Sequence, residues 1–250
     1  MAEEWVHGVY AVAAALKYEP AQLRGLWVER QRRDARIQAL LDDAARRGMP
    51  VHQADRAELD RLSGGARHQG VLARLAVRQR TYGEADLPAL LAAAIGPALL
   101  LVLDGVQDPH NLGACLRSAA AAGVHAVIAP ADRAVGLNAT VRKVACGAVE
   151  ITPFVQVTNL ARTLRGLQEQ GVWIVGAAGE AEESLYQMDF TLPTAIVLGA
   201  EEKGLRRLTR EVCDRLARIP LAEGGVESLN VSVAAGIFLF EARRQRKTMG

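Results

Sequence analysis

The sequence predicts an α/β protein whose larger part is a parallel sheet with helices on both faces. Continuous apolar runs of strand length recur through the second half of the chain, which is typical of strands buried on both faces. Segments of helical length alternate with these runs, and this alternation predicts a parallel sheet. With 250 residues, 50% of them hydrophobic, the chain can build one large domain or two smaller ones.

Residues 1–77 are expected to form a small α/β domain of their own. Asp34 should cap a helix, because the apolar residues after it recur at positions i, i+3, i+4, i+7 and i+8 and a glycine follows as a stop. In chain order we expect a helix over 10–17, a strand over 25–29, the helix after Asp34, a strand over 51–54, a helix over 55–62, a loop over 64–70 and a strand over 71–75. Charged residues, Gly and Pro then accumulate, so we place a linker over 78–95.

Residues 96–250 are expected to form the parallel-sheet domain. Its strands are predicted at 98–103, 126–129, 172–175 and 195–198, with helices at about 111–122, 138–147 and 158–170. A short strand over 216–219 leads through a Gly-rich loop into a last helix with an apolar face, and the basic run over 243–247 is predicted to be a solvated tail. Because ligands of such sheets bind beyond the carboxyl ends of the strands, the residues that follow each strand are the first candidates for a site.

The charge of the chain gives only a weak indication of its partner. The formal net charge is +2, which is too small to predict a nucleic-acid partner by itself. Residues 1–80 carry 14 Lys and Arg against 10 Asp and Glu, a balance of +4, whereas residues 81–250 have a balance of −2. Of the 30 basic residues, 26 are Arg, which favours two-point phosphate contacts, although genome base composition explains the same excess.

We expect no membrane span, export signal, disulfide or metal site. The longest apolar run, residues 90–103, is shorter than the roughly 20 residues of a span and is interrupted by a Gly-Pro pair. The N-terminus is acidic where a secretory signal would be basic. Cys115, Cys146 and Cys213 are odd in number and form no CxxC pair, so they are interpreted as reduced, mostly buried thiols of a cytoplasmic protein.

The first polar stretch follows the strand over 98–103 and reads Asp104-Gly-Val-Gln-Asp-Pro-His-Asn111-Leu-Gly113-Ala-Cys-Leu-Arg117. If a helix begins at Asn111, Gly113 and Arg117 share one face, and Gly113 leaves room beside the Arg117 side chain. The guanidinium could then hold a phosphate through two parallel hydrogen bonds. The alternative is an ordinary helix cap at Asn111 and a solvated surface charge at Arg117.

Two further polar stretches follow later strands. In Gly199-Ala-Glu201-Glu-Lys-Gly, the first glycine lets a ligand lie against the main chain, and Glu201 is either a carboxylate that complements a helix dipole or a functional acid. The third stretch is a Gly-Gly turn that leads to Ser228 and Asn230, where a helix start either presents N–H groups to a polar ligand or is simply capped. Together the three stretches predict a site for a nucleotide-like ligand. Neither a GxGxxG fingerprint after the first strand of this domain nor a Walker motif is present.

In order and spacing, these stretches resemble the three motifs of the SpoU/TrmH-type RNA ribose 2′-O-methyltransferases of the SPOUT superfamily. The motifs are Asn111-Leu-Gly113-x-x-x-Arg117, Leu198-Gly199-Ala-Glu201-x-x-Gly204, and Ile219-Pro220 followed after a loop by Ser228-Leu-Asn230-Val-Ser-Val-Ala. The resemblance continues through the first domain, including His68-Gln-Gly70, to the bacterial subgroup that methylates a guanosine in the peptidyl-transferase region of large-subunit rRNA.

This resemblance implies a deep trefoil knot in the C-terminal domain, which departs from the general rule against threaded chains, and it implies a homodimer. It also implies S-adenosylmethionine as methyl donor without a metal, with cofactor contacts at Gly199, Ile219, Leu221 and Leu229. The first domain would be a ribosomal-protein-like RNA-binding domain, and the partner would be large-subunit rRNA or a pre-ribosomal particle. The loop over 222–227 varies in length in such proteins, so no cofactor contact is carried over to it.

The implied reaction transfers the sulfonium methyl group to a ribose 2′-oxygen in 23S rRNA. We expect Arg117 to clamp the neighbouring phosphate and to stabilise the developing alkoxide, because a guanidinium with a pKa above about 12 is a poor base. Asn111, Glu201, Ser228 and Asn230 are expected to orient Arg117 and the ribose. The alternatives are a tRNA or adenosine-specific rRNA ribose 2′-O-methyltransferase, or a non-catalytic RNA-binding ribosome-assembly factor.

Overall fold

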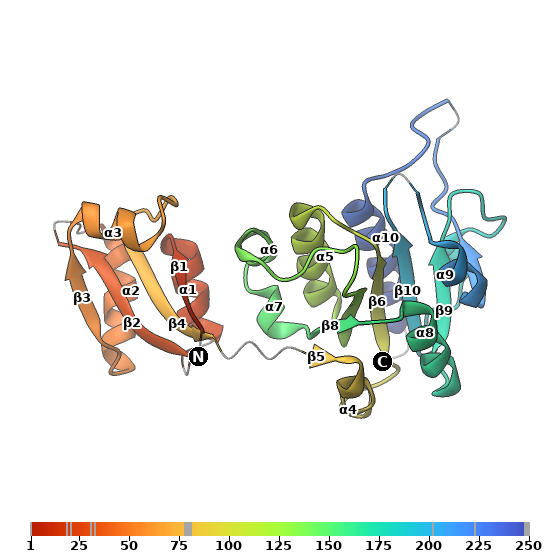
Figure 1. Cartoon of the computed structure of the whole chain (residues 1–250), viewed down its shortest axis with the longest axis horizontal. Helices are drawn as coiled ribbons and strands as arrows, with labels where there is room; N and C mark the ends of the chain where they lie inside the picture. Colours follow the sequence, from red (N-terminus) through yellow and green to blue (C-terminus); the bar gives the residue numbers. More distant parts are fainter. Residues whose placement is uncertain are drawn as a thin grey trace. The chain divides into compact units, whose positions relative to one another are not determined.

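The computed structural model describes residues 2–18, 20, 22–30, 32, 34–77, 82–201, 203–222 and 224–247, and it separates into two compact units, Met1–Arg80 and Thr81–Gly250 (Figure 1). Among the described helices, none is long and apolar enough to cross a membrane. Of the linker expected over 78–95, residues 78–81 lie outside the described part of the chain. The next residues form β5 (Tyr82–Gly83), η1 (Glu84–Asp86) and α4 (Leu87–Ala92). They belong to the second unit, because β5 pairs with its sheet and Leu87 joins its core.

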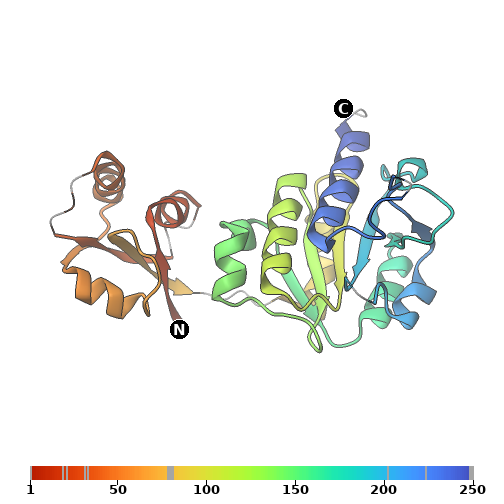
Figure 2. The same ribbon diagram turned by 90° about the horizontal axis from the view of Figure 1, so that it is seen from above.

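The N-terminal unit is a four-stranded sheet, in the order β1-β4-β2-β3, with α1 and α2 on one face and α3 on the other (Figure 2). Its elements are β1 (Ala2–His7), α1 (Val9–Tyr18), β2 (Leu23–Glu29), α2 (Ala35–Arg46), β3 (Val51–Ala54), α3 (Arg56–Leu62) and β4 (Val71–Val77). Asp34 caps α2 as predicted, since its carboxylate accepts from the Ile37 amide at 3.2 Å. We did not predict β1, which is held by antiparallel pairing with β4, the last strand of the unit.

The C-terminal unit is a seven-stranded sheet in the order β11-β9-β10-β6-β7-β8-β5, and every neighbouring pair is parallel. After α4, its elements are β6 (Leu99–Asp104), α5 (Pro109–Ala122), β7 (Ala126–Pro130), α6 (Ala139–Ala145), α7 (Ala148–Ile151), β8 (Phe154–Val157), α8 (Leu160–Glu169), β9 (Trp173–Ala177), η2 (Leu185–Gln187), β10 (Thr194–Gly199), α9 (Arg207–Val212), β11 (Arg215–Ala217) and α10 (Val231–Lys247). The predicted parallel sheet is confirmed. The short elements α7 and β8 were not predicted.

Helices cover both faces of this sheet, as the continuous apolar runs predict (Figure 2). The side chains of successive residues in the central strand β6 point to opposite faces of the sheet and pack in two separate cores. Leu99, Leu101 and Leu103 pack with α5 and α10, whereas Leu100 and Val102 pack with α8 on the other face. A strand with two buried faces must be apolar at every position, which is why these strands stand out in the sequence.

The centre of the sheet is a topological switch point. From β6 the chain moves outward through β7 and β8 on one side, and β10, β9 and β11 lie on the other side. Asp104 and Gly199, the last residues of β6 and β10, are paired with each other. The first two polar stretches therefore begin side by side at the carboxyl edge of the sheet, where ligands of such folds bind.

The end of α10 is only in part the solvated tail that its basic run predicts: Arg244 and Lys247 are exposed, but Arg246 is not free. Arg246 donates to four backbone carbonyl oxygens at 2.6–3.1 Å, those of Pro97, Ala98, Phe190 and Leu192. Burial lowers the pKa of this guanidinium from its usual value, because the charged form loses contact with water. The side chain thus ties the last described turn of the chain to the segments that precede β6 and β10.

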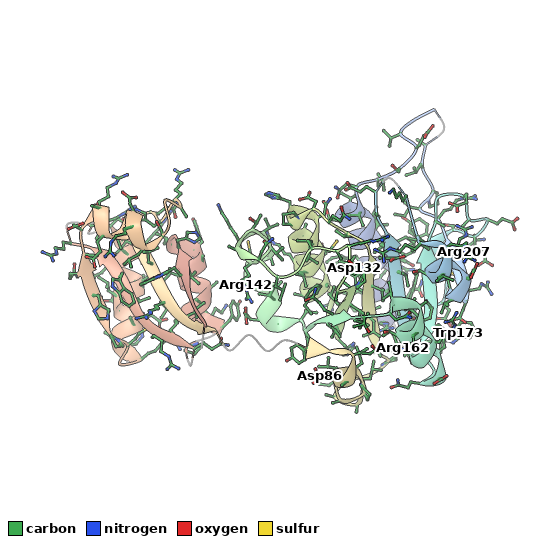
Figure 3. The ribbon with its side chains drawn as sticks, viewed as in Figure 1. Asp86, Asp132, Arg142, Arg162, Trp173 and Arg207 are labelled. Carbon is green, nitrogen blue, oxygen red and sulfur yellow. The ribbon has the colours of Figure 1, made fainter. Side chains whose placement is uncertain are left out.

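Replacing Arg246 with alanine is expected to lower the free energy of unfolding by about 2–4 kcal/mol, because four carbonyl groups lose a charged donor. Urea denaturation measures this change. Arg207→Ala is the matched control: that side chain is 79% exposed and pairs with Glu211 one turn away on α9 (Figure 3), so its removal should cost about 0.5 kcal/mol or less. Equal losses in the two variants would contradict a stabilising role for Arg246.

Candidate functional site

Asn111 lies in the first turn of α5 and does not cap this helix, so one alternative for this residue is wrong. Asp108 is the cap, with its carboxylate accepting from the His110 amide at 2.9 Å, and Pro109 takes the first helical position. Asn111 is only 8% exposed. The predicted buried face of the helix is confirmed, since Leu112, Cys115, Leu116 and Ala119 are at most 1% exposed. Because Asp108 satisfies the helix start, the Asn111 carboxamide is available to another element.

Gly113 makes room for α6 and not for the Arg117 side chain, which corrects our expectation. A Cβ atom on Gly113 would lie 2.6 Å from the Val144 Cβ and 2.9 Å from the Val141 carbonyl oxygen. Real Cβ atoms do not come this close, so only glycine allows α6 to pack against α5 at this point. The consequence for the site is indirect, because this packing brings the end of α6 towards Arg117.

Arg117 is exposed on α5, one turn after Gly113. Its Nη1 atom lies 3.8 Å from the Cys146 Sγ atom, at the end of α6. Within the described residues no carboxylate forms an ion pair with Arg117. A guanidinium that is exposed and lacks a carboxylate partner there is open to an anionic ligand such as a phosphate. Cys146 is exposed, whereas the sequence predicts mostly buried thiols, and only the packing of α6 on α5 brings it near Arg117.

A hydrogen-bonded network joins one residue from each of the three polar stretches. The Glu201 Oε1 atom accepts from the Asn111 Nδ2 atom at 2.8 Å and from the Asn230 Nδ2 atom at 2.7 Å. Asn230 Nδ2 also donates to the Asn111 Oδ1 atom at 2.9 Å. Glu201 lies in a turn well before α9 begins at Arg207, so the alternative of a first-turn carboxylate is wrong. The carboxylate instead fixes the orientation of two carboxamides from distant parts of the chain.

Asn230 caps the last helix, as one of the two alternatives predicts, and its side chain also joins the network; N–H groups presented to a ligand stay a prediction. Its Oδ1 atom accepts from the Ser232 amide at 2.9 Å and from the Ser232 hydroxyl at 2.6 Å, as a cap of α10 does. Its Nδ2 atom donates into the Glu201 network described above. Ser228 lies exposed two residues earlier, and the structure does not bring its hydroxyl into this network. Its expected role in orienting the ribose stays a prediction.

The turn that carries Glu201 folds tightly onto the end of β10. A Cβ atom on Gly199 would overlap the backbone of Gly204 and Leu205, and the Gly204 amide donates to the Ala200 carbonyl oxygen at 2.8 Å. Gly199 is therefore required by the chain's own turn, in addition to any ligand that lies against its main chain. Gly204 itself adopts a φ of +60°.

The residues expected to contact a cofactor lie at the end of β10 and in the segment that runs from β11 to α10. Ile219 is partly buried against the main core, just beyond β11. Leu221 is 39% exposed and Leu229 is half-buried, at the two ends of the loop that leads to α10. Exposed and half-buried leucines beside a polar network suit a ligand with both apolar and polar parts, such as an adenosyl group. Their contacts with a cofactor stay predictions.

Cys115 lies buried on α5, the helix that also carries Asn111 and Arg117. Burial and, to a lesser extent, the charge of Glu201 raise the pKa of the Cys115 thiol to about 12, so it stays protonated. In the part of the chain that the structure describes, no group of three His, Cys, Asp or Glu side chains is placed to hold a metal ion.

Two family models match the chain. The SpoU rRNA Methylase family model matches residues 98–240, and a model described as RNA 2′-O ribose methyltransferase substrate binding matches residues 5–80. The chain is 58% identical over 243 residues to a Pseudomonas aeruginosa protein named 23S rRNA (guanosine-2′-O-)-methyltransferase RlmB, with 97% of each chain covered. The protein of the same name from Escherichia coli is 55% identical over 243 residues, which cover 97% of this chain and 99% of that one.

Solved structures resemble the whole chain as well. A protein described as an RNA 2′-O ribose methyltransferase matches 98% of this chain and 89% of its own, with a TM-score of 0.77 and 27% identity. An AdoMet-bound rRNA methyltransferase from Sinorhizobium meliloti matches 97% of this chain and 87% of its own, with a TM-score of 0.73 and 25% identity. Both matches span the two units described above.

Proposed function

The chain belongs to the SpoU rRNA methylase family, and from this premise we propose that it transfers the methyl group of S-adenosylmethionine to the ribose 2′-oxygen of a guanosine in the peptidyl-transferase region of 23S rRNA. The single observation that carries this proposal beyond the family is the Asn111–Glu201–Asn230 network, which gathers the three polar stretches at one edge of the sheet. The relatives named above supply the substrate class, and the AdoMet-bound neighbour supports the methyl donor.

Arg117 is the residue that acts on the nucleophile. A ribose hydroxyl is a weak nucleophile, so the enzyme has to position its oxygen in line with the methyl group and favour loss of its proton. The Arg117 guanidinium grips the phosphate next to the target ribose with two donors, and its positive charge stabilises the alkoxide as it forms. Its exposed position without a carboxylate partner among the described residues supports this role.

The Asn111–Glu201–Asn230 network fixes the helix that carries Arg117 relative to the helix that follows the cofactor loop. Asn111 lies on the same helix as Arg117, and Asn230 caps the helix that follows the cofactor loop. Glu201 links these two helices, so the ribose-binding side and the cofactor-binding side keep a constant spacing. S-adenosylmethionine supplies an activated methyl group, and Gly199, Ile219, Leu221 and Leu229 are the residues that hold it.

The C-terminal unit forms a deep trefoil knot. The segment between β9 and β10 supports this, because it bonds both to the residue just after β11 and to α10, which lie later in the chain. The Leu185 amide donates to the Arg218 carbonyl oxygen at 2.9 Å, just beyond β11, and the Phe190 amide donates to the Gln245 Oε1 atom at 2.8 Å, near the end of α10. The chain from β11 to α10 thus passes the same segment twice.

The protein acts as a cytoplasmic homodimer on large-subunit rRNA or a pre-ribosomal particle. Val233 and Phe240 lie seven residues apart on α10 and are each 50% exposed, so they form an apolar stripe that a second copy would cover. The N-terminal unit binds the RNA. Its match to a substrate-binding family model and the positive balance of residues 1–80 support this assignment.

The test is a map of ribose methylation in rRNA and tRNA from cells with and without the gene. We expect one guanosine of 23S rRNA to lose its mark and to regain it when the gene is restored. Loss of a mark in tRNA or at an adenosine would replace the proposed substrate. If no mark is lost and the purified protein binds no S-adenosylmethionine in a titration, the protein is an assembly factor and not an enzyme.

A further inference from the structure

Asp104 ends β6 with a side chain that is completely buried. Its partner in the sheet is Gly199, the last residue of β10, so Asp104 stands where the turn that carries Glu201 begins. Burying a carboxylate is unfavourable unless charged or hydrogen-bonding groups compensate it. The groups that surround this carboxylate therefore indicate what it does.

Both oxygens of Asp104 face Arg206. The Oδ2 atom accepts from the Arg206 backbone amide at 2.9 Å. The Oδ1 atom lies 3.3 Å from the Arg206 Nε atom, in an ion pair whose geometry does not make a hydrogen bond. The same guanidinium lies against the main chain at Gly105, where a Cβ atom would be 3.0 Å from the Arg206 Nη2 atom. The carboxylate thus binds the backbone and the side chain of one residue.

Arg206 ends the turn that carries Glu201, and the start of that turn is fixed separately. The Gly204 amide donates to the Ala200 carbonyl oxygen at 2.8 Å, and the turn folds onto Gly199. Glu201 lies between these two anchor points and accepts from the carboxamides of Asn111 and Asn230. Without the Asp104 anchor, the end of the turn would lose the hydrogen bond from the Arg206 amide to β6.

We propose that Asp104 is a positioning residue for methyl transfer, which acts by holding Arg206, and with it the turn that carries Glu201, so that Glu201 reaches Asn111 and Asn230. This inference rests on the proposed function. Asp104 does not touch the reacting atoms, and its effect passes through Glu201 to the two helices that carry Asn111 and Asn230. A small displacement of the turn would withdraw Glu201 from both carboxamides, and a misplacement of about 1 Å can cost about 100-fold in rate.

The test is a double-mutant cycle: kcat and KM are measured for Asp104→Ala, Glu201→Ala and the double variant with 23S rRNA and S-adenosylmethionine. Asp104→Ala is expected to lower kcat by about 100-fold and to change the KM for RNA by less than about threefold, because the RNA contacts remain. Since Asp104 acts through Glu201, the double variant should be at most about threefold slower than Glu201→Ala. The proposal would be overturned if the loss of kcat in the double variant equals the product of the two single losses, or if kcat is unchanged in Asp104→Ala.

Two further variants separate positioning from folding. Asp132→Ala removes a carboxylate that follows the adjacent strand β7, where it is 88% exposed and pairs with Arg133 (Figure 3), so its kcat should not change. Asp104→Asn keeps an acceptor for the Arg206 amide and is expected to recover about tenfold of the lost kcat. If the alanine variant does not fold, Asp104→Asn takes its place in the cycle. If both variants fold and Asp104→Asn is as slow as Asp104→Ala, the proposed role of the Arg206 hydrogen bond is contradicted. A wild-type protein that methylates no ribose would instead refute the proposed function.

Discussion

Replacing Arg117 with alanine is expected to lower kcat by about 1,000-fold and to leave S-adenosylmethionine binding unchanged, because the phosphate clamp and the charge that stabilises the alkoxide are both lost. The variant should fold normally, since the side chain is exposed and forms no ion pair with a carboxylate among the described residues. Single-turnover methylation of 23S rRNA measures the loss, and calorimetric titration measures cofactor binding.

Two variants define what Arg117 contributes. Arg117→Lys keeps the charge but not the two parallel donors, so it should still be slower than wild type by about 100-fold. Lys143→Ala removes an exposed cation from the neighbouring helix α6 and should retain normal turnover. Near-normal turnover by Arg117→Lys would exclude the two-donor clamp, and a large loss in Lys143→Ala would point to general charge attraction of RNA.

Replacing Gly199 with alanine is expected to abolish S-adenosylmethionine binding and to lower the free energy of unfolding by about 3 kcal/mol or more. The added Cβ atom would overlap backbone atoms of Gly204 and Leu205, which cannot move as a flexible side chain can. Relief of this overlap requires the turn to leave its position, and Glu201 leaves with it. Urea denaturation and cofactor titration measure the two effects.

Gly166→Ala is the matched control for this substitution. Gly166 lies inside α8, and apart from its chain neighbours and the nearby backbone of its own helix nothing lies within 4 Å of the position that its Cβ atom would occupy. Alanine there should stabilise the protein by about 0.5–1 kcal/mol, because a helix favours alanine over glycine. If the Gly199→Ala protein binds the cofactor as well as the Gly166→Ala protein does, the turn after β10 is not part of the cofactor site.

Local patterns in the sequence were sufficient for most of the fold. The strands β6, β7, β9 and β10 lie where the apolar runs predict them, because a strand covered on both faces is apolar at every position. Asp34 caps α2 because a short acidic side chain can reach the free amides of a helix start without help from other elements. Of the elements that were missed, β1 is held by pairing with β4 at the other end of its unit, and β8 has only four residues.

The candidate site was predicted less completely. Each polar stretch by itself fitted an ordinary structural explanation, and only the hydrogen bonds that join Asn111, Glu201 and Asn230 bring the three together. The explanation of Gly113 as space for Arg117 was wrong, because the contact that requires glycine comes from α6, a separate helix. The basic run at the end of α10 was also misinterpreted in part, since its carbonyl partners lie 54 or more residues away in the sequence.

The sequence by itself determined the class of the fold, the order of the motifs and the residue types that carry the chemistry, because these follow from local periodicity and from spacing along the chain. The tertiary structure decided which of these residues act together. The roles of Arg246, Gly113 and Asp104 depend on contacts between segments distant in sequence. Arg246 binds carbonyl oxygens before β6 and β10, Gly113 packs against α6, and Asp104 binds the residue that ends the Glu201 turn. Hydrogen bonds and steric overlap act over a few ångströms of space, and distance in space is what a linear pattern does not contain.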